Sequence, residues 1–386
     1  MLVLGIRPDV IRASLLIKQL KHVLGDAFVF VWSGQHYSAN LRDVFFSQLQ
    51  VPQPDHQVDV DISNETRFIA SLTEGLSELV VREKPAFCGF LGDTNTVLGS
   101  LACAAHNVPI FHIEGCMRSY DWRMPEEKYR TVIDHLSDVI YAYLPAYKRQ
   151  GEAEGLDARS IVVTGNPIVD VLQYYFISGR IRMSSEDFSA MLSAHHLDAT
   201  SFVLMTAHRR ENVDNRASLE VILELVRTCP FPVVFPASYR TQRSLREFGL
   251  ARPHNLLLID PIGYIEFLEL LSAARYVMTD SGTVVEEAAI LGVPSIQMRS
   301  STERPEVYEC GASVKFDPHA PSAFQTTRQS HESAIKLRDT RWHHGLGDGN
   351  ASELILNDML SRLGGTLPIR GHDPRGSSKP YQRNWM

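Results

Sequence analysis

The sequence predicts an α/β protein made of two doubly wound, Rossmann-like domains. Short apolar segments alternate with longer segments whose apolar residues recur at helical spacing, a pattern typical of parallel sheets covered by helices on both faces. The alternation stops and begins again near the middle of the chain. The length of 386 residues also fits two domains at about 150 residues each.

The first series of strands is predicted from apolar runs that are followed by polar residues or glycine. These runs are Met1–Gly5, Phe28–Ser33, Phe87–Leu91, Ile110–Glu114 and Val139–Tyr143. Helices are predicted between them from two sets of periodic apolar residues. One set is Val10, Ile11, Leu15, Ile17 and Leu20, and the other is Phe68, Leu72, Leu76 and Val80.

The second series of strands repeats this pattern. Its predicted members are Ser160–Thr164, Phe202–Thr206, Val233–Pro236, Leu256–Asp260, Val277–Asp280 and Ser295–Met298. Between two of them, one helical face is formed by Leu219, Ile222, Leu223 and Val226. We place the boundary near residues 163–170, which predicts an N-terminal domain over 1–165 and a C-terminal domain over 166–349. Residues 365–386 are rich in Gly, Pro, Arg and Ser and predict an irregular tail.

Composition and charge exclude several classes of protein. The formal charge of −7, from 38 basic and 45 acidic residues, argues against a nucleic-acid or membrane-surface partner. No apolar run approaches the length of a membrane span, and the first residues are too short for a signal-peptide core. The five cysteines form no C-x-x-C pair, so we expect reduced cysteines, no metal site and a cytoplasmic location.

Three carboxylates follow strands or open a helix in the first predicted domain. Asp93 follows one strand within Gly92-Asp-Thr, Glu114 follows the next within His-Ile-Glu, and Glu126 follows Pro125 at a predicted helix start. Because open α/β sheets bind ligands at the carboxyl ends of their strands, we expect all three to face a cleft between the domains. Carboxylates placed among arginines can supply both an acid and a base near neutral pH. Glu127 is expected to serve only as a first-turn helix residue.

Basic and hydroxyl residues suited to phosphate occur in three places. Arg7 lies in the loop after the first strand, where a guanidinium can bind an anion, although a surface arginine explains it equally well. His208, Arg209 and Arg210 follow a strand of the second domain and can hold a diphosphate, with a solvated charge run as the alternative. Ser281 and Gly282 stand between a strand and a helix, where free backbone amides and the helix dipole favour phosphate.

Many of these motifs occur together, in order, in one enzyme family. The motifs are Gly5-Ile-Arg-Pro-Asp9, Gly34-Gln35-His36, Gly92-Asp93-Thr94, His112-Ile-Glu114, Pro125-Glu126-Glu127, Thr164-Gly165-Asn166, His208-Arg209-Arg210-Glu211, Thr279-Asp-Ser281-Gly282, Thr302-Glu303-Arg304-Pro305-Glu306 and Gly347-Asp348-Gly349. The chain therefore resembles the non-hydrolysing UDP-N-acetylglucosamine 2-epimerases over residues 1 to about 363.

The resemblance implies a fold of the glycosyltransferase-B type and an isomerase activity. The active site would lie between the domains, and a C-terminal helix over about 350–363 would pack back on the first domain. The family interconverts UDP-GlcNAc and UDP-ManNAc by anti elimination of UDP, which gives 2-acetamidoglucal, followed by re-addition of UDP. No cofactor and no metal are implied. A cytoplasmic homodimer that supplies polysaccharide biosynthesis would be expected.

The resemblance also implies roles for individual residues. Asp93, Glu114, Glu126 and His208 would form the catalytic set, with the three carboxylates as the acid–base group. The substrate would be bound by Arg7, Arg12, Arg130, Arg209, Phe267, Ser281, Gly282, Glu287 and Arg304, with Phe267 at the uracil and Glu287 at the ribose. Gln35, His36 and Asn40 fall in the region where some relatives bind a regulatory UDP-GlcNAc.

Several positions depart from the usual family pattern. Ile6, Asp9 and Arg12 stand where the family usually has Thr, Glu and Lys. Glu114-Gly-Cys replaces Glu-Ala-Gly, Tyr129-Arg130 replaces Asn-Arg, and Ser281-Gly-Thr replaces Ser-Gly-Gly. These changes leave four functions open: the epimerase acting on UDP-GlcNAc; the same reaction on UDP-2,3-diacetamido-glucuronate or a 6-deoxy-talose type of UDP-sugar; a glycosyltransferase of the same fold; and a UDP-sugar-binding protein without catalysis.

Overall fold

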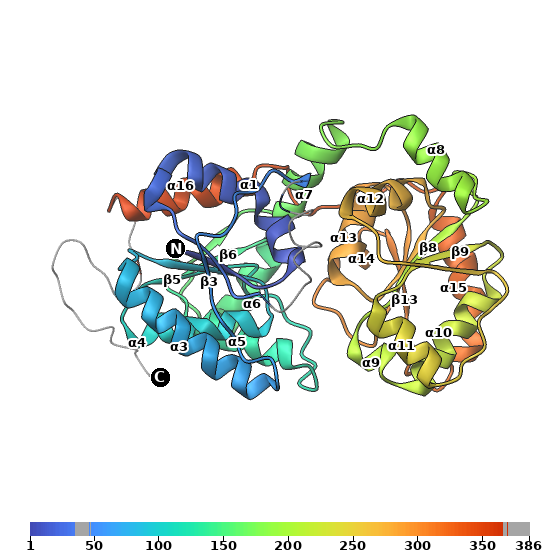
Figure 1. Cartoon of the computed structure of the whole chain (residues 1–386), viewed down its shortest axis with the longest axis horizontal. Coiled ribbons are helices and arrows are strands. Elements are labelled where there is room, and N and C mark those ends of the chain that lie inside the picture. The colour runs from blue at the N-terminus through green and yellow to red at the C-terminus, as the bar shows by residue number, and fades with distance from the viewer. Residues whose placement is uncertain (35–45, 47, 366–368, 370–386) are drawn as a thin grey trace. The chain divides into compact units, whose positions relative to one another are not determined.

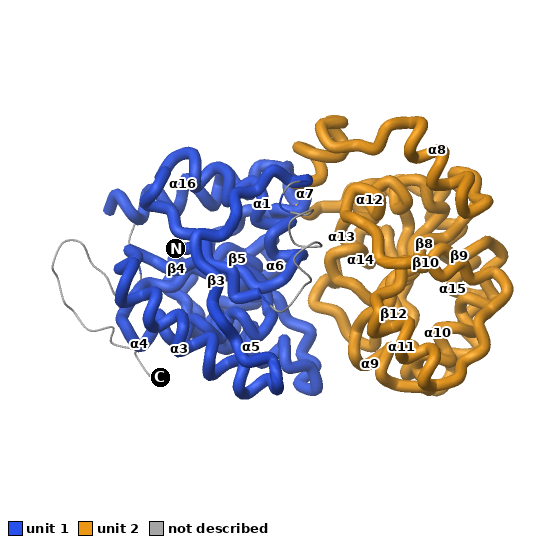
Figure 2. Tube along the Cα trace, viewed as in Figure 1, with its two compact units in different colours: residues 1–170, 347–386 blue, residues 171–346 orange. Residues whose placement is uncertain are grey.

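The computed structural model describes residues 1–34, 46, 48–365 and 369. The chain divides into two compact units (Figure 2). Unit 1 consists of residues 1–170 and 347–386, and unit 2 consists of residues 171–346. Each unit contains one parallel sheet flanked by helices, so the predicted α/β class is confirmed.

The sheet of unit 1 has the strand order β3-β2-β1-β4-β5-β6-β7, and every pairing is parallel. Its strands are β1 (Leu2–Leu4), β2 (Phe30–Trp32), β3 (His56–Gln57), β4 (Cys88–Leu91), β5 (Ile110–Ile113), β6 (Val139–Ala142) and β7 (Ile161–Val163). The direction in which successive strands are added to the sheet reverses between β1 and β4, as in Rossmann folds. Polar residues that follow these two strands therefore lie at the same edge of the sheet.

The helices of unit 1 bury their apolar faces against this sheet and against one another. They are α1 (Arg7–Leu24), α3 (Glu65–Glu83), α4 (Ser100–Ala105), α5 (Pro125–Leu136), α6 (Pro145–Ala153), α7 (Pro167–Val171) and α16 (Ala351–Leu363), with short 3-10 segments at Gly25–Ala27 and Asn95–Gly99. Phe68, Leu72 and Leu76 of α3 are at most 3% exposed in the core that also contains Val3 and Phe90.

Helix α16 returns from the end of the described chain to unit 1. In Figure 1 the red α16 lies beside the blue α1 although they are far apart in sequence. Asp170 accepts hydrogen bonds from the backbone nitrogens of Ala351 at 3.1 Å and Ser352 at 2.6 Å, and so caps the first turn of α16. Near the other end, the Tyr141 hydroxyl donates to Asp358 at 2.9 Å. Two polar contacts thus fix the helix along its length.

The sheet of unit 2 has the strand order β10-β9-β8-β11-β12-β13, again parallel throughout. Its strands are β8 (Val203–Thr206), β9 (Val233–Pro236), β10 (Leu256–Ile259), β11 (Val277–Thr279), β12 (Ser295–Met298) and β13 (Ser313–Phe316). A π-helical segment, Leu172–Ile177, leads into the unit. Its helices are α8 (Ser185–Ala194), α9 (Arg210–Val213), α10 (Arg216–Thr228), α11 (Tyr239–Glu247), α12 (Tyr264–Ala273), α13 (Gly282–Ile290), α14 (Glu306–Glu309) and α15 (Ala323–Leu337).

Three strand assignments differ from the sequence prediction. The segment Ser160–Thr164 was expected to open the second series, but it forms β7 beside β6 in the first sheet. Strands β3 and β13 were not predicted at all. Both lie at a sheet edge and are partly exposed, so neither shows the continuous apolar run of a central strand.

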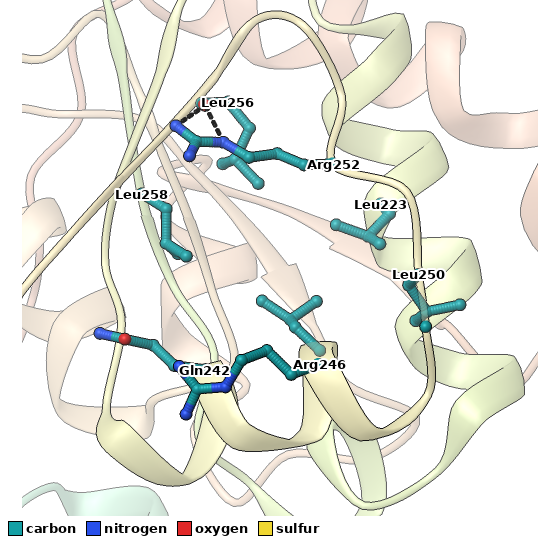
Figure 3. A pocket seen from close by; sticks show the side chains of 9 residues that line it. Leu223, Gln242, Arg246, Leu250, Arg252, Leu256 and Leu258 are labelled. Atoms are coloured by element: carbon teal, nitrogen blue, oxygen red, sulfur yellow. Dashed lines mark hydrogen bonds between the residues drawn. The ribbon is translucent and has the colours of Figure 1, made fainter.

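One pocket of about 330 Å³ is present on unit 2 between α10, α11 and β10 (Figure 3). Leucines form most of its wall, including Leu223, Leu256 and Leu258. Arg252 turns both Nε and Nη2 toward the Leu256 carbonyl, at 2.8 and 2.6 Å, so its guanidinium serves the local backbone. None of the predicted site residues lines this pocket.

Gln35, His36 and Asn40, the predicted regulatory residues, lie outside the described residues, as does nearly all of the predicted tail over 365–386. Within the described part of the chain, no helix is long and apolar enough to cross a membrane.

Candidate active site

Unit 1 carries a buried charge cluster where α1 meets the end of β5. Arg12 of α1 donates from Nη2 to Asp9 Oδ1 at 2.9 Å and pairs through Nη1 with Glu114, the residue directly after β5. All three side chains are at most 5% exposed. Asp9 and Arg12, which stand where the family usually has Glu and Lys, therefore contact each other. A shorter carboxylate is paired here with a longer cation.

Burial changes the acidity of one carboxyl in this cluster. Desolvation raises the pKa of Asp9 from 3.8 to about 6, although the charge and hydrogen bond of Arg12 act in the opposite direction. The charge of Asp93 contributes to the increase, so Asp93 lies within electrostatic range of Asp9. Asp9 also accepts a 3.3 Å hydrogen bond from the Ile6 backbone nitrogen and thereby caps α1.

Glu114 is held in an unusual backbone conformation. Its φ of 77° lies in the left-handed region that side chains other than glycine rarely adopt. The Tyr143 hydroxyl donates to Glu114 Oε2 at 3.2 Å, on the same oxygen that Arg12 contacts. Backbone strain of this kind persists where the surrounding structure over-determines it and is concentrated at functional sites.

Asp93 forms a second charge cluster next to the first. Its carboxylate, 21% exposed, pairs with Arg130 Nη2, and Arg130 Nη1 donates to Glu127 Oε2 at 2.5 Å. Gly92, which directly precedes Asp93, packs against the first cluster, because a Cβ at this position would lie 3.2 Å from Arg12 Nη2 and 4.0 Å from Glu114 Oε2. Gly92 also has a φ of 83°, a backbone conformation that favours glycine. Both the limited space and the backbone conformation therefore explain why glycine stands at this position.

The other predicted residues of unit 1 border these clusters in sequence. Glu126 is half-buried at the second residue of α5, directly before Glu127, and Arg7 is half-buried at the first residue of α1. Tyr129 departs from the usual Asn, and its hydroxyl donates to Glu65 on α3 at 2.5 Å. Its hydroxyl is therefore directed to a neighbouring helix, whereas the adjacent Arg130 reaches Asp93.

A buried polar network supports the loops that carry Asp93 and Glu114. His112 of β5 donates from Nε2 to the Gly92 carbonyl at 2.8 Å, and its Nδ1 lies 2.7 Å from Asp134 Oδ1. Asp134 also accepts from Arg118 at 2.6 Å and from the Cys116 backbone nitrogen at 3.0 Å. Burial raises the pKa of Asp134, but the hydrogen bonds and charges of His112 and Arg118 outweigh this effect and hold it below the ordinary value.

In unit 2 the predicted phosphate-binding segment is arranged around Asp280. This residue is fully buried and accepts hydrogen bonds from the backbone nitrogens of His208 and Arg209, each at 3.0 Å to Oδ2. Asn212 Nδ2 donates to the same oxygen at 3.2 Å, and His208 Nδ1 lies 3.3 Å from Oδ1. The His208 side chain remains 54% exposed, so Asp280 orients a histidine that is open to solvent.

Ser281 and Gly282 form the turn from β11 into α13. Ser281 is the N-cap, and its hydroxyl accepts a 3.4 Å hydrogen bond from the Val284 backbone nitrogen. A Cβ on Gly282 would lie 2.6 Å from Arg304 Nη1, so glycine is required for close packing. Arg304 is buried beneath this turn and pairs with Glu286, at 2.8 Å from Nε, and with Glu303. The turn leaves backbone amides at a helix start, which is the arrangement suited to phosphate.

Glu287 and Phe267 occupy neighbouring helices of unit 2. Glu287 is 2% exposed and accepts a hydrogen bond from the Tyr264 hydroxyl at 2.7 Å, which joins α13 to α12. Phe267 is half-buried one turn after Tyr264 on α12. Arg209 is half-buried and donates from Nε to the Asp280 carbonyl at 3.0 Å.

The structure adds residues that the sequence reasoning had not singled out. Glu127, expected to serve only as a first-turn residue, is buried and pairs with Arg130, and Asp134 and Asp280 organise two loops. A signal was available for α5, because Glu127, Arg130 and Asp134 are spaced i, i+3 and i+7 and so share one helix face. Among the described residues, no group of three His, Cys, Asp or Glu side chains could hold a metal ion.

The chain is similar to known proteins over most of its length. A family model described as UDP-N-acetylglucosamine 2-epimerase matches residues 22–360. The UDP-N-acetylglucosamine 2-epimerase of Methanocaldococcus jannaschii is 33% identical over 365 residues, which cover 92% of this chain and 97% of that protein. The UDP-2,3-diacetamido-2,3-dideoxy-D-glucuronate 2-epimerase of Pseudomonas aeruginosa is also 33% identical, over 369 residues that cover 94% and 99%.

Solved structures show the same fold. The M. jannaschii enzyme in complex with UDP-GlcNAc and UDP superposes with a TM-score of 0.83 at 30% identity, covering 93% of this chain and 98% of that one. The Neisseria meningitidis UDP-GlcNAc 2-epimerase bound to UDP-GlcNAc gives 0.81 at 26% identity, covering 93% and 99%. The predicted glycosyltransferase-B type of fold is thus confirmed. The chain belongs to the UDP-N-acetylglucosamine 2-epimerase family and is an isomerase.

Proposed function

We propose that this protein interconverts UDP-GlcNAc and UDP-ManNAc. The observation that carries the proposal is the pair of adjacent charge clusters in unit 1, where Glu114 pairs with Arg12 and Asp93 pairs with Arg130. Inverting C2 of a sugar requires removal of its proton on one face and delivery of a proton on the other. Two carboxylates on neighbouring strand ends, each beside its own cation, suit this task.

The proposed reaction is an anti elimination followed by its reversal on the other face. A carboxylate takes the C2 proton, the C–H electron pair forms the C1–C2 double bond, and the C1–O bond breaks with its electrons leaving on UDP. The intermediate is 2-acetamidoglucal. A proton is then added to the opposite face of C2, and UDP returns to C1. Asp93, Glu114 and Glu126 form the acid–base group of this proposal.

The UDP part of the substrate is assigned to unit 2. His208, Arg209 and the backbone amides after Ser281 and Gly282 would bind the diphosphate, which gains negative charge as it leaves. Arg7 and Arg12 of unit 1 are further proposed contacts of the substrate. Glu287 would accept from the ribose hydroxyls, and Phe267 would contact the uracil. Two related enzymes were solved with UDP-GlcNAc bound, which supports a UDP-sugar as the substrate.

A second substrate is UDP-2,3-diacetamido-2,3-dideoxy-D-glucuronate. The relative named for that substrate is as similar to this chain, at 33% identity, as the M. jannaschii UDP-N-acetylglucosamine 2-epimerase. The chemistry at C2 is the same for both sugars, so the two substrates differ only in the groups at C3 and C5. We further propose that the enzyme is a cytoplasmic homodimer that supplies polysaccharide synthesis.

The first experiment is incubation with UDP-GlcNAc in D2O, followed by proton NMR of the sugar. Deuterium incorporated at C2 together with the appearance of UDP-ManNAc is the expected result. Binding of UDP without any exchange at C2 would contradict this substrate, and the same assay with the diacetamido-glucuronate sugar then tests the second one. The Glu114→Gln variant serves as the control for exchange that does not arise from the enzyme.

A further inference from the structure

The loop between β5 and α5 is strained and carries the site carboxylate Glu114 at its start. Within residues 114–124, Glu114, Cys116 and Tyr120 have φ values of 77°, 65° and 56°. This left-handed conformation is unfavourable for residues other than glycine and persists where surrounding contacts compensate for it. The loop also presents Tyr120 and Trp122 to solvent, at 65% and 59% exposed. Contacts elsewhere must therefore hold this segment in place.

Glu127 supplies the contacts that hold the second half of this loop. Its carboxylate is 1% exposed and accepts from the backbone nitrogen and hydroxyl of Ser119, at 2.9 and 2.8 Å, through Oε2. Its Oε1 accepts from the Tyr120 backbone nitrogen at 2.8 Å. Three donors from two successive residues thus converge on one side chain at the strained position.

Glu127 does not serve as an ordinary helix cap. It is the third residue of α5, where a glutamate usually reaches back to the backbone nitrogen of the N-cap residue. Here that N-cap residue is Met124, whose nitrogen donates to the Asp121 carbonyl at 2.9 Å instead. The Glu127 carboxylate is directed past the helix start to the preceding loop.

The same carboxylate holds Arg130 against Asp93. Arg130 is 1% exposed, donates from Nη1 to Glu127 at 2.5 Å, and pairs through Nη2 with Asp93. A buried guanidinium with two carboxylates on two of its nitrogens has little freedom to rotate. The direction of Asp93 therefore depends on Glu127 as well as on Arg130.

We propose that Glu127 is a positioning residue that sets the two acid–base carboxylates relative to each other. Through Arg130 it fixes Asp93, and through Ser119 and Tyr120 it fixes the loop that begins at Glu114. This inference rests on the proposed epimerase function. It extends that function by assigning the alignment of the proton donor and acceptor to a buried carboxylate that takes no part in the chemistry.

The test is the variant Glu127→Gln, which keeps the size of the side chain but replaces one acceptor oxygen by a donor group. We expect kcat for UDP-GlcNAc epimerisation to fall by about 100-fold, since a small misplacement of reacting groups has an effect of that size. KM should stay within about twofold, because most of the proposed UDP contacts lie in unit 2. Glu269→Gln is the matched control, since Glu269 is also buried and accepts from an arginine, Arg182, at 2.8 Å and from the Met183 backbone nitrogen at 3.1 Å, but lies in unit 2.

A second measurement reports on the loop without using activity. Arg123 lies in the loop with its side chain 79% exposed, so trypsin can cut after it when the loop opens. Glu127→Gln should accelerate this cut by about tenfold relative to wild type and Glu269→Gln, because the lost hydrogen bonds lower the cost of local opening. Cleavage is followed by mass spectrometry.

The outcomes separate this inference from the proposed function. Faster cleavage with a lower kcat and an unchanged KM supports the positioning role. Faster cleavage with an unchanged kcat shows a purely structural contact and overturns that role, as does a kcat loss of equal size in Glu269→Gln. Cleavage and kcat that both match wild type overturn the inference entirely. If wild type turns over neither UDP-sugar, the proposed function fails, and unchanged cleavage in Glu127→Gln then overturns the loop assignment separately.

Discussion

At the level of single residues, unit 1 places two buried arginines among four carboxylates. Arg12 lies between Asp9 and Glu114, and Arg130 lies between Asp93 and Glu127. Removing charges from water is costly, and an uncompensated buried charge is strongly destabilising. Each arginine therefore compensates two acidic groups and also fixes their direction, which is the preorganisation that proton transfer at a carbon atom requires.

The first residue-scale prediction concerns Glu114. The variant Glu114→Gln keeps the side-chain shape but cannot accept the C2 proton. Turnover of UDP-GlcNAc should fall by about 10²–10⁴-fold, the usual contribution of a general acid or base. UDP should still bind with wild-type affinity, as measured by calorimetry. Retained exchange at C2 in D2O would remove Glu114 from the acid–base group.

The second residue-scale prediction concerns the pH dependence of stability through Asp9. Its pKa rises from 3.8 to about 6 on folding, mainly because of burial, so between these values the folded chain holds a proton that the unfolded chain has released. The contribution of Asp9 to stability is therefore present at low pH and is lost as pH rises through this interval. The loss amounts to roughly 3 kcal/mol at about 1.4 kcal/mol per pKa unit.

Urea unfolding across that interval tests the assignment. The difference in unfolding free energy between wild type and Asp9→Asn should change with pH, in favour of the variant as pH rises. A difference that stays constant from pH 3.8 to about 6 would show that Asp9 does not titrate there.

At the level of elements, helix α5 shows how one face can serve several loops. Its buried face carries Glu127, Arg130, Ile133 and Asp134, of which only Ile133 is apolar. Glu127 binds the loop at Ser119, Arg130 binds Asp93, and Asp134 binds the segment at Cys116. The helix therefore acts as a rigid support to which the strand-end loops are attached by side chains.

The element-scale prediction concerns the docking of α16. Asp170 accepts from two backbone nitrogens at the start of this helix, and burial raises the pKa of its carboxyl. Asp170→Ala leaves those donors without their acceptor and should lower the free energy of unfolding by about 1–3 kcal/mol. Hydrogen exchange should become faster in the first turn of α16. Asp157→Ala, which removes an exposed contact to Arg159, is the control and should leave α16 unchanged.

At the level of the whole molecule, each unit has its own parallel sheet and its own hydrophobic core. The chain passes between the units twice, at residues 170–171 and 346–347. The predicted functional residues divide accordingly. The proposed acid–base group lies in unit 1, and the residues assigned to UDP lie mainly in unit 2.

This division predicts where UDP alone protects the protein from hydrogen exchange. Protection should be concentrated at the His208–Arg209 segment and at the first turn of α13, because both are assigned to the diphosphate and ribose. The segment around Gly92 and Glu114 should change little until a complete UDP-sugar is added. Protection by UDP that is confined to unit 1 would contradict the assignment.

The fold class, most central strands and the family could be predicted from the amino-acid sequence alone. These features depend on local signals: central parallel strands are continuous apolar runs, and motifs are read directly from residue order. The sequence also singled out Asp93, Glu114 and His208 because each follows a strand end. Such positions can be recognised without knowledge of what lies beside them.

The contacts between residues distant in sequence became known from the folded structure. The edge strands β3 and β13, the sheet to which β7 belongs, and the contacts of Glu127, Asp134 and Asp280 all depend on neighbours distant in sequence. The physical reason is that strand order sets which loops adjoin at a sheet edge. Hydrophobic periodicity predicts whether a side chain is buried. It does not predict which group a buried charge will pair with, because that group is brought close only when the sheet has folded.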